Sequence, residues 1–213
     1  MGLPETNGTV LVIDDDPSVR KGLTRLLRSS GFIVQAFGSA QEYLDSSIDR
    51  TSPACLVLDV MLPGLDGLGL QEELESRDDS IPIVFITGHG EISDSVKAMK
   101  RGAVDFLPKP FDDEDLLRAV GEALQQDSER RTACDLAKSI TERVERLTPR
   151  EFEVLRHVIA GRLNKQIGFA LGIAEKTVKV HRGRMMEKME VASVAELVRL
   201  VERAGIEPVQ ISS

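Results

Sequence analysis

Five short apolar runs, each followed by a segment of helical periodicity, constrain the fold of this chain more than any other feature of its sequence. The runs cover residues 9–13, 32–36, 54–58, 82–86 and 104–107, and the helical segments cover residues 17–30, 39–46, 66–76, 91–100 and 112–125. Strands that are apolar along their whole length are typical of a parallel sheet covered on both faces. We therefore expect an open, doubly wound α/β domain.

Charged and hydroxyl side chains stand where these strands end. Because the carboxyl ends of parallel strands meet at one edge of a sheet, we expect the side chains there to form a single pocket. The second run ends without a charge, which suits an edge strand. The pocket residues follow or end the other four runs: Asp14, Asp15 and Asp16, then Asp59, then Thr87, then Lys109.

Such a cluster has a definite chemistry. Carboxylates crowded in a partly dry crevice repel one another, and Mg²⁺ relieves the repulsion because it prefers oxygen ligands. A metal, the Lys109 ammonium and the Thr87 hydroxyl together form a receptor for phosphoryl oxygens, and a carboxylate held there can attack phosphorus. Each residue alone is more often a cap or a surface residue, so the prediction depends on their conjunction.

Charge is divided unequally along the chain. Residues 1–126 hold 11 Lys and Arg against 22 Asp and Glu, whereas residues 127–213 hold 16 against 13. The net charge of −8 therefore conceals an acidic part followed by a basic part, which indicates two different functions. The basic part can bind DNA within an acidic protein, because phosphate contacts are local.

The sequence argues against several classes of protein. No apolar run is long enough to cross a bilayer, and the first eight residues lack the features of a signal peptide. Cys55 and Cys134 are far apart and fit neither a metal site nor a disulfide framework. We expect a soluble cytoplasmic protein that does not associate with membranes.

Capping residues and glycines divide the C-terminal part into helices. Residues 127–146 contain neither Pro nor Gly and indicate a helical linker. Thr148 and Glu151 form a capping-box pattern around Pro149, which opens the first helix of an all-helical domain over residues 147–208. Three further helices are expected: one capped by Asn164 after Gly161, one over residues 175–189 after Gly172, and one capped by Ser193.

The helix over residues 175–189 carries an excess of basic side chains and follows a short turn. Val178, Met185 and Met189 fall at helical spacing and should face a core, which leaves the basic face for solvent or phosphate. A basic helix face is often only solvated. Here the two helices joined by residues 171–174 form a helix-turn-helix pattern, which favours DNA binding.

Four segments of the N-terminal part resemble the receiver domain of bacterial response regulators. They are VLVIDDDPSVR, CLVLDVMLPGLDGL, IPIVFITGHG and GAVDFLPKPF, and the resemblance covers residues 8–126. It implies a flavodoxin-like five-stranded sheet of order 2-1-3-4-5 and a cis Lys109–Pro110 bond. It also implies Asp59 as the phospho-acceptor, Mg²⁺ held by Asp14, Asp15, Asp59 and the carbonyl of Met61, and phosphoryl binding and switching by Thr87, Phe106 and Lys109.

The C-terminal part resembles the LuxR-type helix-turn-helix domain of NarL and FixJ regulators. The resemblance rests on LTPREFEVLRHVIAGRLNKQIGFALGIAEKTVKVHRGRMMEKM. It implies binding of double-stranded DNA through Asn164, Lys165, Thr177, Lys179, Val180, His181, Arg184 and Lys188.

Together the two resemblances imply a two-component response regulator of the FixJ group rather than an enzyme. A sensor histidine kinase would phosphorylate Asp59, and the phosphorylated chain would form a homodimer on DNA and regulate transcription, more often by activation. RNA polymerase is a further candidate partner.

Two alternatives remain at this point. One is a DNA-binding regulator that works without phosphorylation, against which the complete set of pocket residues argues. The other is a Mg²⁺-dependent phosphatase with Asp59 as nucleophile. Such enzymes usually carry a second Asp two positions later, where this chain has Met61.

Overall fold

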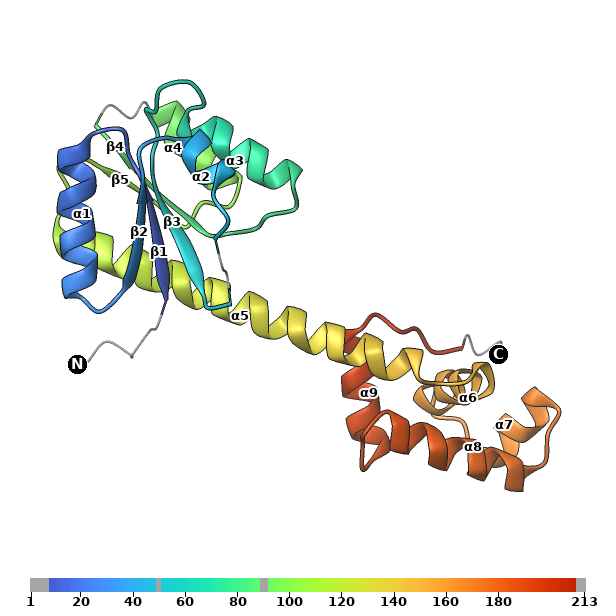
Figure 1. Cartoon of the computed structure of the whole chain (residues 1–213). Helices are drawn as coiled ribbons and strands as arrows, with labels where there is room; N and C mark the ends of the chain where they lie inside the picture. Colours follow the sequence, from blue (N-terminus) through green and yellow to red (C-terminus); the bar gives the residue numbers. More distant parts are fainter. Residues whose placement is uncertain (1–7, 49–50, 89–91, 210–213) are drawn as a thin grey trace. The chain divides into compact units, whose positions relative to one another are not determined.

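The computed structural model describes residues 8–48, 51–88 and 92–209. They belong to two compact units, residues 1–131 and residues 132–213 (Figure 1). Among the described residues, no helix combines the length and the apolar character that a membrane span requires.

The N-terminal unit is built on a parallel sheet of five strands. The strands are β1 (Thr9–Ile13), β2 (Ile33–Phe37), β3 (Ala54–Asp59), β4 (Ile83–Thr87) and β5 (Asp105–Pro108). Their order is β2-β1-β3-β4-β5, which confirms the predicted topology. Every residue of β1, β3 and β4 is buried, as the uninterrupted apolar runs predicted. Strand β2 lies at the edge, and only Val34 and Phe37 of its five residues are buried.

Helices cover both faces of this sheet (Figure 1). Leu11 and Leu56 face one apolar layer, which α2 (Ala40–Asp45), α3 (Gly67–Ser76) and α4 (Ile92–Lys100) complete. The alternate residues of the same strands face a second layer, formed with α1 (Pro17–Ser29) and the first part of α5 (Asp113–Glu145). Helix α4 was expected to begin at residue 91, which lies outside the described residues.

Helix α5 (Asp113–Glu145) is longer than the sequence indicated, because it has 33 residues and includes the segment predicted as a linker. No Pro or Gly lies between Gly121 and Pro149. Asp127, at the expected start of the linker, is buried and accepts a hydrogen bond from the backbone N–H of Ala54 at 3.0 Å. Its carboxylate is paired with Arg130 and Arg131, so the burial of this charge is compensated.

The C-terminal unit contains the helices α6 (Pro149–Ile159), α7 (Asn164–Leu171), α8 (Glu175–Lys188) and α9 (Val194–Arg203). Their apolar faces meet in one core that includes Val154, Ile167, Val178 and Met185. The predicted capping box of Thr148 and Glu151 is present. Gly172 ends α7 with a φ of 65°, a conformation that glycine adopts without strain.

The prediction that Asn164 caps α7 is wrong. Asn164 is the first residue of the helix, and Leu163 occupies the cap position without a capping side chain. The N–H of Leu163 donates instead to Oε1 of Gln166 at 2.8 Å. The Asn164 side chain accepts a hydrogen bond from Arg182 of α8 at 2.9 Å.

Candidate functional sites

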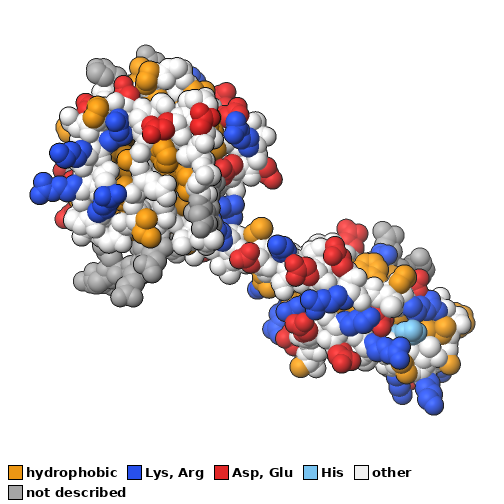
Figure 2. Space-filling view, viewed as in Figure 1, with side chains coloured by type: hydrophobic (Ala, Val, Ile, Leu, Met, Phe, Trp, Pro, Cys, Tyr) orange, Lys and Arg blue, Asp and Glu red, His pale blue; other side chains and the backbone are white. Residues whose placement is uncertain are grey.

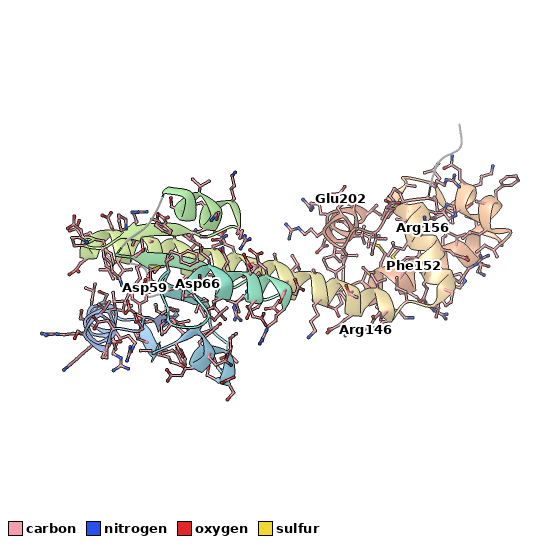
Figure 3. All side chains as sticks on the ribbon, turned by 90° about the horizontal axis from the view of Figure 1, so that it is seen from above. Asp59, Asp66, Arg146, Phe152, Arg156 and Glu202 are labelled. Atoms are coloured by element: carbon pink, nitrogen blue, oxygen red, sulfur yellow. The ribbon has the colours of Figure 1, made fainter. Side chains whose placement is uncertain are left out.

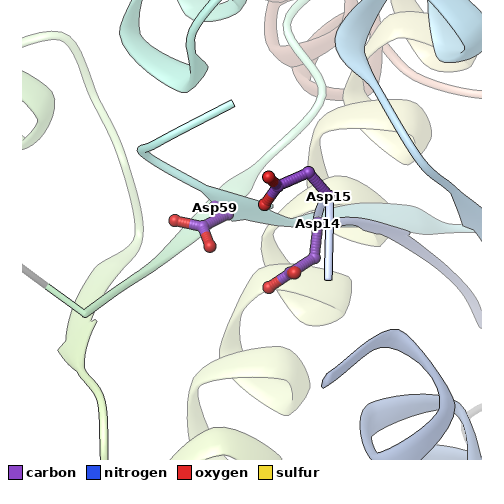
Figure 4. A group of neighbouring side chains, drawn as sticks. All are labelled: Asp14, Asp15 and Asp59. Carbon is purple, nitrogen blue, oxygen red and sulfur yellow. The ribbon is translucent and has the colours of Figure 1, made fainter. Parts of the chain in front are cut away.

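An acidic crevice lies at the carboxyl ends of β1 and β3, which are neighbours at the centre of the sheet. Ile13 pairs with Leu58, so Asp14 and Asp59 follow at adjacent positions. Both residues are buried, whereas Asp15 is exposed. The carboxylates of these three residues gather at one place (Figure 4), with ligand oxygens within 4.8 Å of one another. The structure thus brings together Asp14, Asp15 and Asp59, three of the four carboxylates that were predicted there, whereas Asp16 does not belong to this group.

Lys109 enters this crevice from the end of β5. Its Nζ donates to Oδ2 of Asp14 at 2.7 Å and to Oδ2 of Asp59 at 2.6 Å. Its backbone N–H donates to the carbonyl oxygen of Thr87 at 2.6 Å, which joins it to the end of β4. The Lys109–Pro110 bond is cis, as the resemblance implied. Four of the five strands therefore contribute to one site.

The electrostatics of the crevice reflect crowding and burial. Burial raises the pKa of Asp14 above its ordinary value, and the hydrogen bond from Lys109 opposes this effect without cancelling it. Burial alone would lower the pKa of Lys109, but its hydrogen bonds with Asp14 and Asp59 hold that pKa above its ordinary value. Three carboxylates face one ammonium group, so the crevice keeps an excess of negative charge.

Backbone contacts fix the position of Asp59. Its Oδ1 accepts a hydrogen bond from the N–H of Met61 at 3.0 Å. A Cβ atom at Gly67 would lie 2.4 Å from the carbonyl oxygen of Asp59, so only glycine allows α3 to approach so closely. Asp66 caps α3 beside this contact and is marked with Asp59 in Figure 3. Sequence reasoning did not single out Gly67, although a turn before a helix is where such a glycine would be sought.

Asp14 has a second anchor that the sequence did not reveal. Nη1 of Arg20, in the first turns of α1, donates to the Asp14 carbonyl oxygen at 2.6 Å. The Oδ1 of Asp14 accepts from the N–H of Asp16, and Asp16 itself caps α1. The role expected of Asp16 at this edge is therefore partly that of a helix cap.

The predicted switch residues lie on β4 and β5. Thr87 is buried at the end of β4. Phe106 stands opposite Phe85 across the two strands, with their ring centroids 6.1 Å apart. Phe106 is partly buried, whereas Met61, beside Asp59 in sequence, is 62% exposed.

The donor atoms of the crevice fit a hard divalent cation. All the side-chain ligands that it offers are carboxylate oxygens, which Mg²⁺ prefers and softer metals do not. The excess negative charge favours such a cation as well. No thiolate or imidazole belongs to this group of side chains.

A second candidate site is the outer face of α8 with the start of α7. Val178 and Met185 turn toward the core, whereas Lys179, Val180 and Arg184 of the same helix are exposed. Figure 2 shows several Lys and Arg side chains on the visible face of the C-terminal unit. The predicted DNA-contact residues that are exposed are Lys165, Thr177, Lys179, Val180 and Arg184.

Three other predicted DNA contacts are engaged within the unit or partly covered. Asn164 is bonded to Arg182, as described above. The Nζ of Lys188 lies 2.6 Å from a carboxylate oxygen of the buried Glu151. His181 is partly buried, and its Nδ1 has no hydrogen-bond partner among the described residues. The sequence indicated Glu151 only as part of a cap and gave no sign of its pairing with Lys188.

Comparison with known proteins agrees with both parts of the molecule. A model of response regulator receiver domains matches residues 10–121, and a model of the luxR family of bacterial regulatory proteins matches residues 145–201. Nodulation protein W of Bradyrhizobium diazoefficiens is 51% identical over 94% of this chain and 88% of its own length. The transcriptional regulatory protein FixJ of the same organism is 42% identical over 94% of this chain and 98% of its own length.

A solved structure shows the same architecture. The response regulator StyR is 50% identical to this chain and gives a TM-score of 0.85. The match covers 92% of this chain and 99% of that protein.

Proposed function

Because the chain belongs to the bacterial response regulators that join a receiver domain to a luxR-family DNA-binding domain, we propose that phosphorylation of Asp59 controls its binding to DNA. Members of this family regulate transcription within two-component systems and are not enzymes. A receiver domain implies a histidine kinase as partner, and the luxR-family domain implies DNA.

The observation that carries the proposal is the Lys109 ammonium group bonded to both Asp14 and Asp59. Of the three carboxylates, Asp14 is fully buried and has both oxygens hydrogen-bonded, and Asp15 is exposed to solvent. Asp59 lies between these extremes, with one oxygen held by the N–H of Met61 and the other by Lys109. It is therefore oriented, partly desolvated and within reach of a phosphodonor at the mouth of the crevice.

The reaction follows from these positions. An oxygen of Asp59 attacks the phosphorus of a phosphohistidine, the phosphorus–nitrogen bond breaks, and the imidazole nitrogen leaves with the electron pair. The product is an aspartyl phosphate, whose charge Lys109 stabilises by moving from carboxylate to phosphoryl oxygen. The Thr87 hydroxyl donates a hydrogen bond to another phosphoryl oxygen.

Asp14, Asp15, Asp59 and the carbonyl of Met61 would hold Mg²⁺ beside this reaction. When bound, the cation neutralises charge that accumulates on the phosphoryl oxygens. The residues of the chain then have separate tasks: Asp59 attacks, Lys109 and Thr87 bind oxygen, and Gly67 allows α3 to hold the backbone of Asp59 in place.

The switch begins at Thr87 and Lys109, because the N–H of Lys109 is bonded to the Thr87 carbonyl. Movement of either residue alters the ends of β4 and β5, and Phe106 on β5 adjusts its packing against Phe85. The changed face favours a homodimer. A shift of only a few kcal/mol is enough to reverse the populations of two states.

DNA binding uses the outer face of α8. Thr177, Lys179, Val180 and Arg184 enter the major groove, with His181 at the edge of this face, and Lys165 contacts a phosphate. Asn164 and Lys188 act on this surface through their partners, Arg182 and Glu151. Phosphate contacts make the affinity strongly dependent on salt.

The test is selection of binding sites from random duplex DNA by the full-length protein, with and without Mg²⁺ and a small-molecule phosphodonor. Wild type is compared with Asp59→Asn and with Asp45→Asn, which alters an exposed carboxylate in α2. We expect wild type and Asp45→Asn to gain one phosphoryl group by mass spectrometry and to bind paired half-sites more tightly, whereas Asp59→Asn does neither.

Two outcomes would contradict the proposal. If all three proteins bind DNA equally with and without the phosphodonor, the receiver does not control binding. If Asp59→Asn still gains a phosphoryl group, another residue is the acceptor.

A further inference from the structure

An aromatic side chain on α7 is left outside the core of the C-terminal unit. Phe169 is 92% exposed, the largest exposed fraction among the large apolar side chains of the described residues. The opposite face of α7 packs inward through Ile167 and Gly168, so the helix is stable without any contribution from the Phe169 ring. One exposed apolar residue is common on protein surfaces, and its surroundings decide whether it forms a site.

Phe169 forms one wall of a groove of about 580 Å³ between α7 and the turn that follows α6. The groove combines an aromatic wall, small residues and two cations, and its lining contains no acidic residue. The lining residues are Ala160, Gly161, Arg162, Lys165, Gln166, Phe169 and Ala170. Such a shape accepts an apolar side chain beside the aromatic ring.

The charge of the groove selects an acidic occupant. Nη1 of Arg162 lies 3.3 Å from Nδ1 of His157, which accepts a hydrogen bond when the neutral ring carries its proton on Nε2. Burial lowers the pKa of His157, and the charge of Arg162 lowers it further. The contact with this ring therefore does not offset the positive charge of Arg162. Among the described residues, neither Arg162 nor Lys165 is paired with a carboxylate.

The position of Lys165 indicates where the occupant comes from. Lys165 and Phe169 are four residues apart and share the outer face of α7. The proposed function places Lys165 at a DNA phosphate. An occupant of the groove would therefore stand next to the DNA backbone, where a second protein bound to the same duplex would present its surface.

We propose that this groove docks an acidic surface of RNA polymerase that carries an apolar side chain, and that Phe169 and Arg162 are its main contacts. The inference rests on the proposed function and adds to it the surface by which the DNA-bound regulator recruits its partner. Aromatic and Arg side chains dominate the binding energy of many interfaces, so truncating either one should have a large effect.

The experiment uses the phosphorylated full-length protein, a duplex carrying a selected half-site pair upstream of a weak promoter, and purified bacterial RNA polymerase holoenzyme. The variants are Phe169→Ala and Arg162→Glu. The matched control is Ile33→Ala, which removes an apolar side chain that is 55% exposed on β2. DNA affinity is measured by fluorescence anisotropy, and transcript yield is measured on the same template.

We expect Phe169→Ala to bind the duplex within about twofold of wild type, because the side chain is exposed, and to lose about tenfold in activated transcription. Arg162→Glu should lose activation at least as strongly, and Ile33→Ala should behave as wild type. Circular dichroism of each variant checks that the fold is retained.

Several results would overturn the docking proposal while leaving the proposed function intact. If Phe169→Ala activates normally, or if wild type binds DNA without activating transcription, the groove does not recruit polymerase. A parallel fall in DNA affinity would make the groove a DNA contact. If unphosphorylated Phe169→Ala binds DNA more tightly than unphosphorylated wild type, the acidic receiver is the occupant of the groove. If Phe169→Ala binds the two half-sites less cooperatively than wild type, the occupant is a second copy of the chain. If wild type binds no DNA at all, the proposed function itself fails.

Discussion

The two units of this molecule each pair a lysine with a buried carboxylate, and they do so with different charge balances. In the receiver, Lys109 stands between Asp14 and Asp59, with Asp15 close by. In the DNA-binding unit, Lys188 pairs with the single carboxylate of Glu151, which also accepts the N–H of Thr148 at 2.9 Å. The first site keeps an excess of negative charge, whereas the second is balanced.

This difference in balance is what we expect between the proposed phosphorylation site and an ion pair that supports the structure. In the receiver the pKa of Asp14 is raised by burial despite Lys109, so the carboxylates there are incompletely compensated. Burial would also raise the pKa of Glu151, but the hydrogen bonds from Lys188 and Thr148 hold it below its ordinary value. A site whose carboxylates are incompletely compensated gains electrostatic stabilisation when a cation or a phosphoryl group binds. A compensated pair loses stabilisation when either partner is removed.

The largest effect is expected where the balanced pair is broken. Glu151→Ala removes the capping-box partner and leaves Lys188 without its carboxylate, which should lower the free energy of unfolding of the DNA-binding unit by about 2 kcal/mol, or about thirtyfold in the unfolding constant. Urea unfolding measured by circular dichroism provides the test. The control is Glu153→Ala, which alters an exposed residue two positions away. Equal shifts in the two variants would show that the pair contributes nothing specific.

The next effect concerns the unbalanced site. Lys109→Gln removes the ammonium group that is bonded to Asp14 and Asp59, so a divalent cation should bind these carboxylates about tenfold more tightly. Isothermal titration calorimetry with Mg²⁺ measures this change. Lys21→Gln, which removes an exposed lysine on α1, should leave the affinity unchanged. An unaltered affinity in Lys109→Gln would mean that the lysine does not compete with the metal.

A smaller effect should distinguish two lysines of the DNA-binding unit. Lys165 is exposed, so Lys165→Ala should weaken DNA binding by a few-fold and reduce the slope of log affinity against log salt by about 0.9. Lys188 is bonded to Glu151, so Lys188→Gln should lower stability with little change in slope. Titrations at several salt concentrations compare the two variants. If both variants reduce the slope of log affinity against log salt equally, Lys188 contacts a phosphate as well.

The smallest effect is a dependence of stability on pH. Because the pKa of Glu151 is lower in the folded protein than its ordinary value of 4.5, its contribution is present above that value and is lost as the pH falls through the folded pKa. We expect the DNA-binding unit of Glu151→Gln to lose less stability than wild type when the pH is lowered through this range. Thermal unfolding of both proteins at a series of pH values gives the comparison.

Much of the receiver could be predicted from the sequence, because each inference there used a local pattern or a general rule. Apolar runs gave the strands, and the rule that parallel strands share one carboxyl edge placed Asp14, Asp59, Thr87 and Lys109 together. The order of the strands came from the family resemblance. Arg20 could not be found in this way, because its bond to the Asp14 carbonyl depends on the path of α1.

The DNA-binding unit was less predictable at the level of single residues. Helix boundaries followed from Thr148, Gly172 and Ser193, but the partners of Asn164 and Lys188 depend on how α7, α6 and α8 pack. Polar side chains that look free in a sequence can be used within the fold. The extent of α5 was missed for a different reason, because a change in composition at residue 127 looked like a boundary although nothing there stops a helix.

Strand β3 connects two features that have so far been treated separately. Asp59 is its last residue, and the N–H of Ala54, its first residue, is bonded to the buried Asp127 of α5. A strand of six residues spans roughly 20 Å and is stiff along its length, because its neighbours hold it on both sides. Strand β3 is therefore a stiff connection, with the proposed phospho-acceptor Asp59 at one end and the hydrogen bond to Asp127 of α5 at the other. A displacement of β3 along its axis would act on that hydrogen bond directly, without passing through the side chains of the apolar layers.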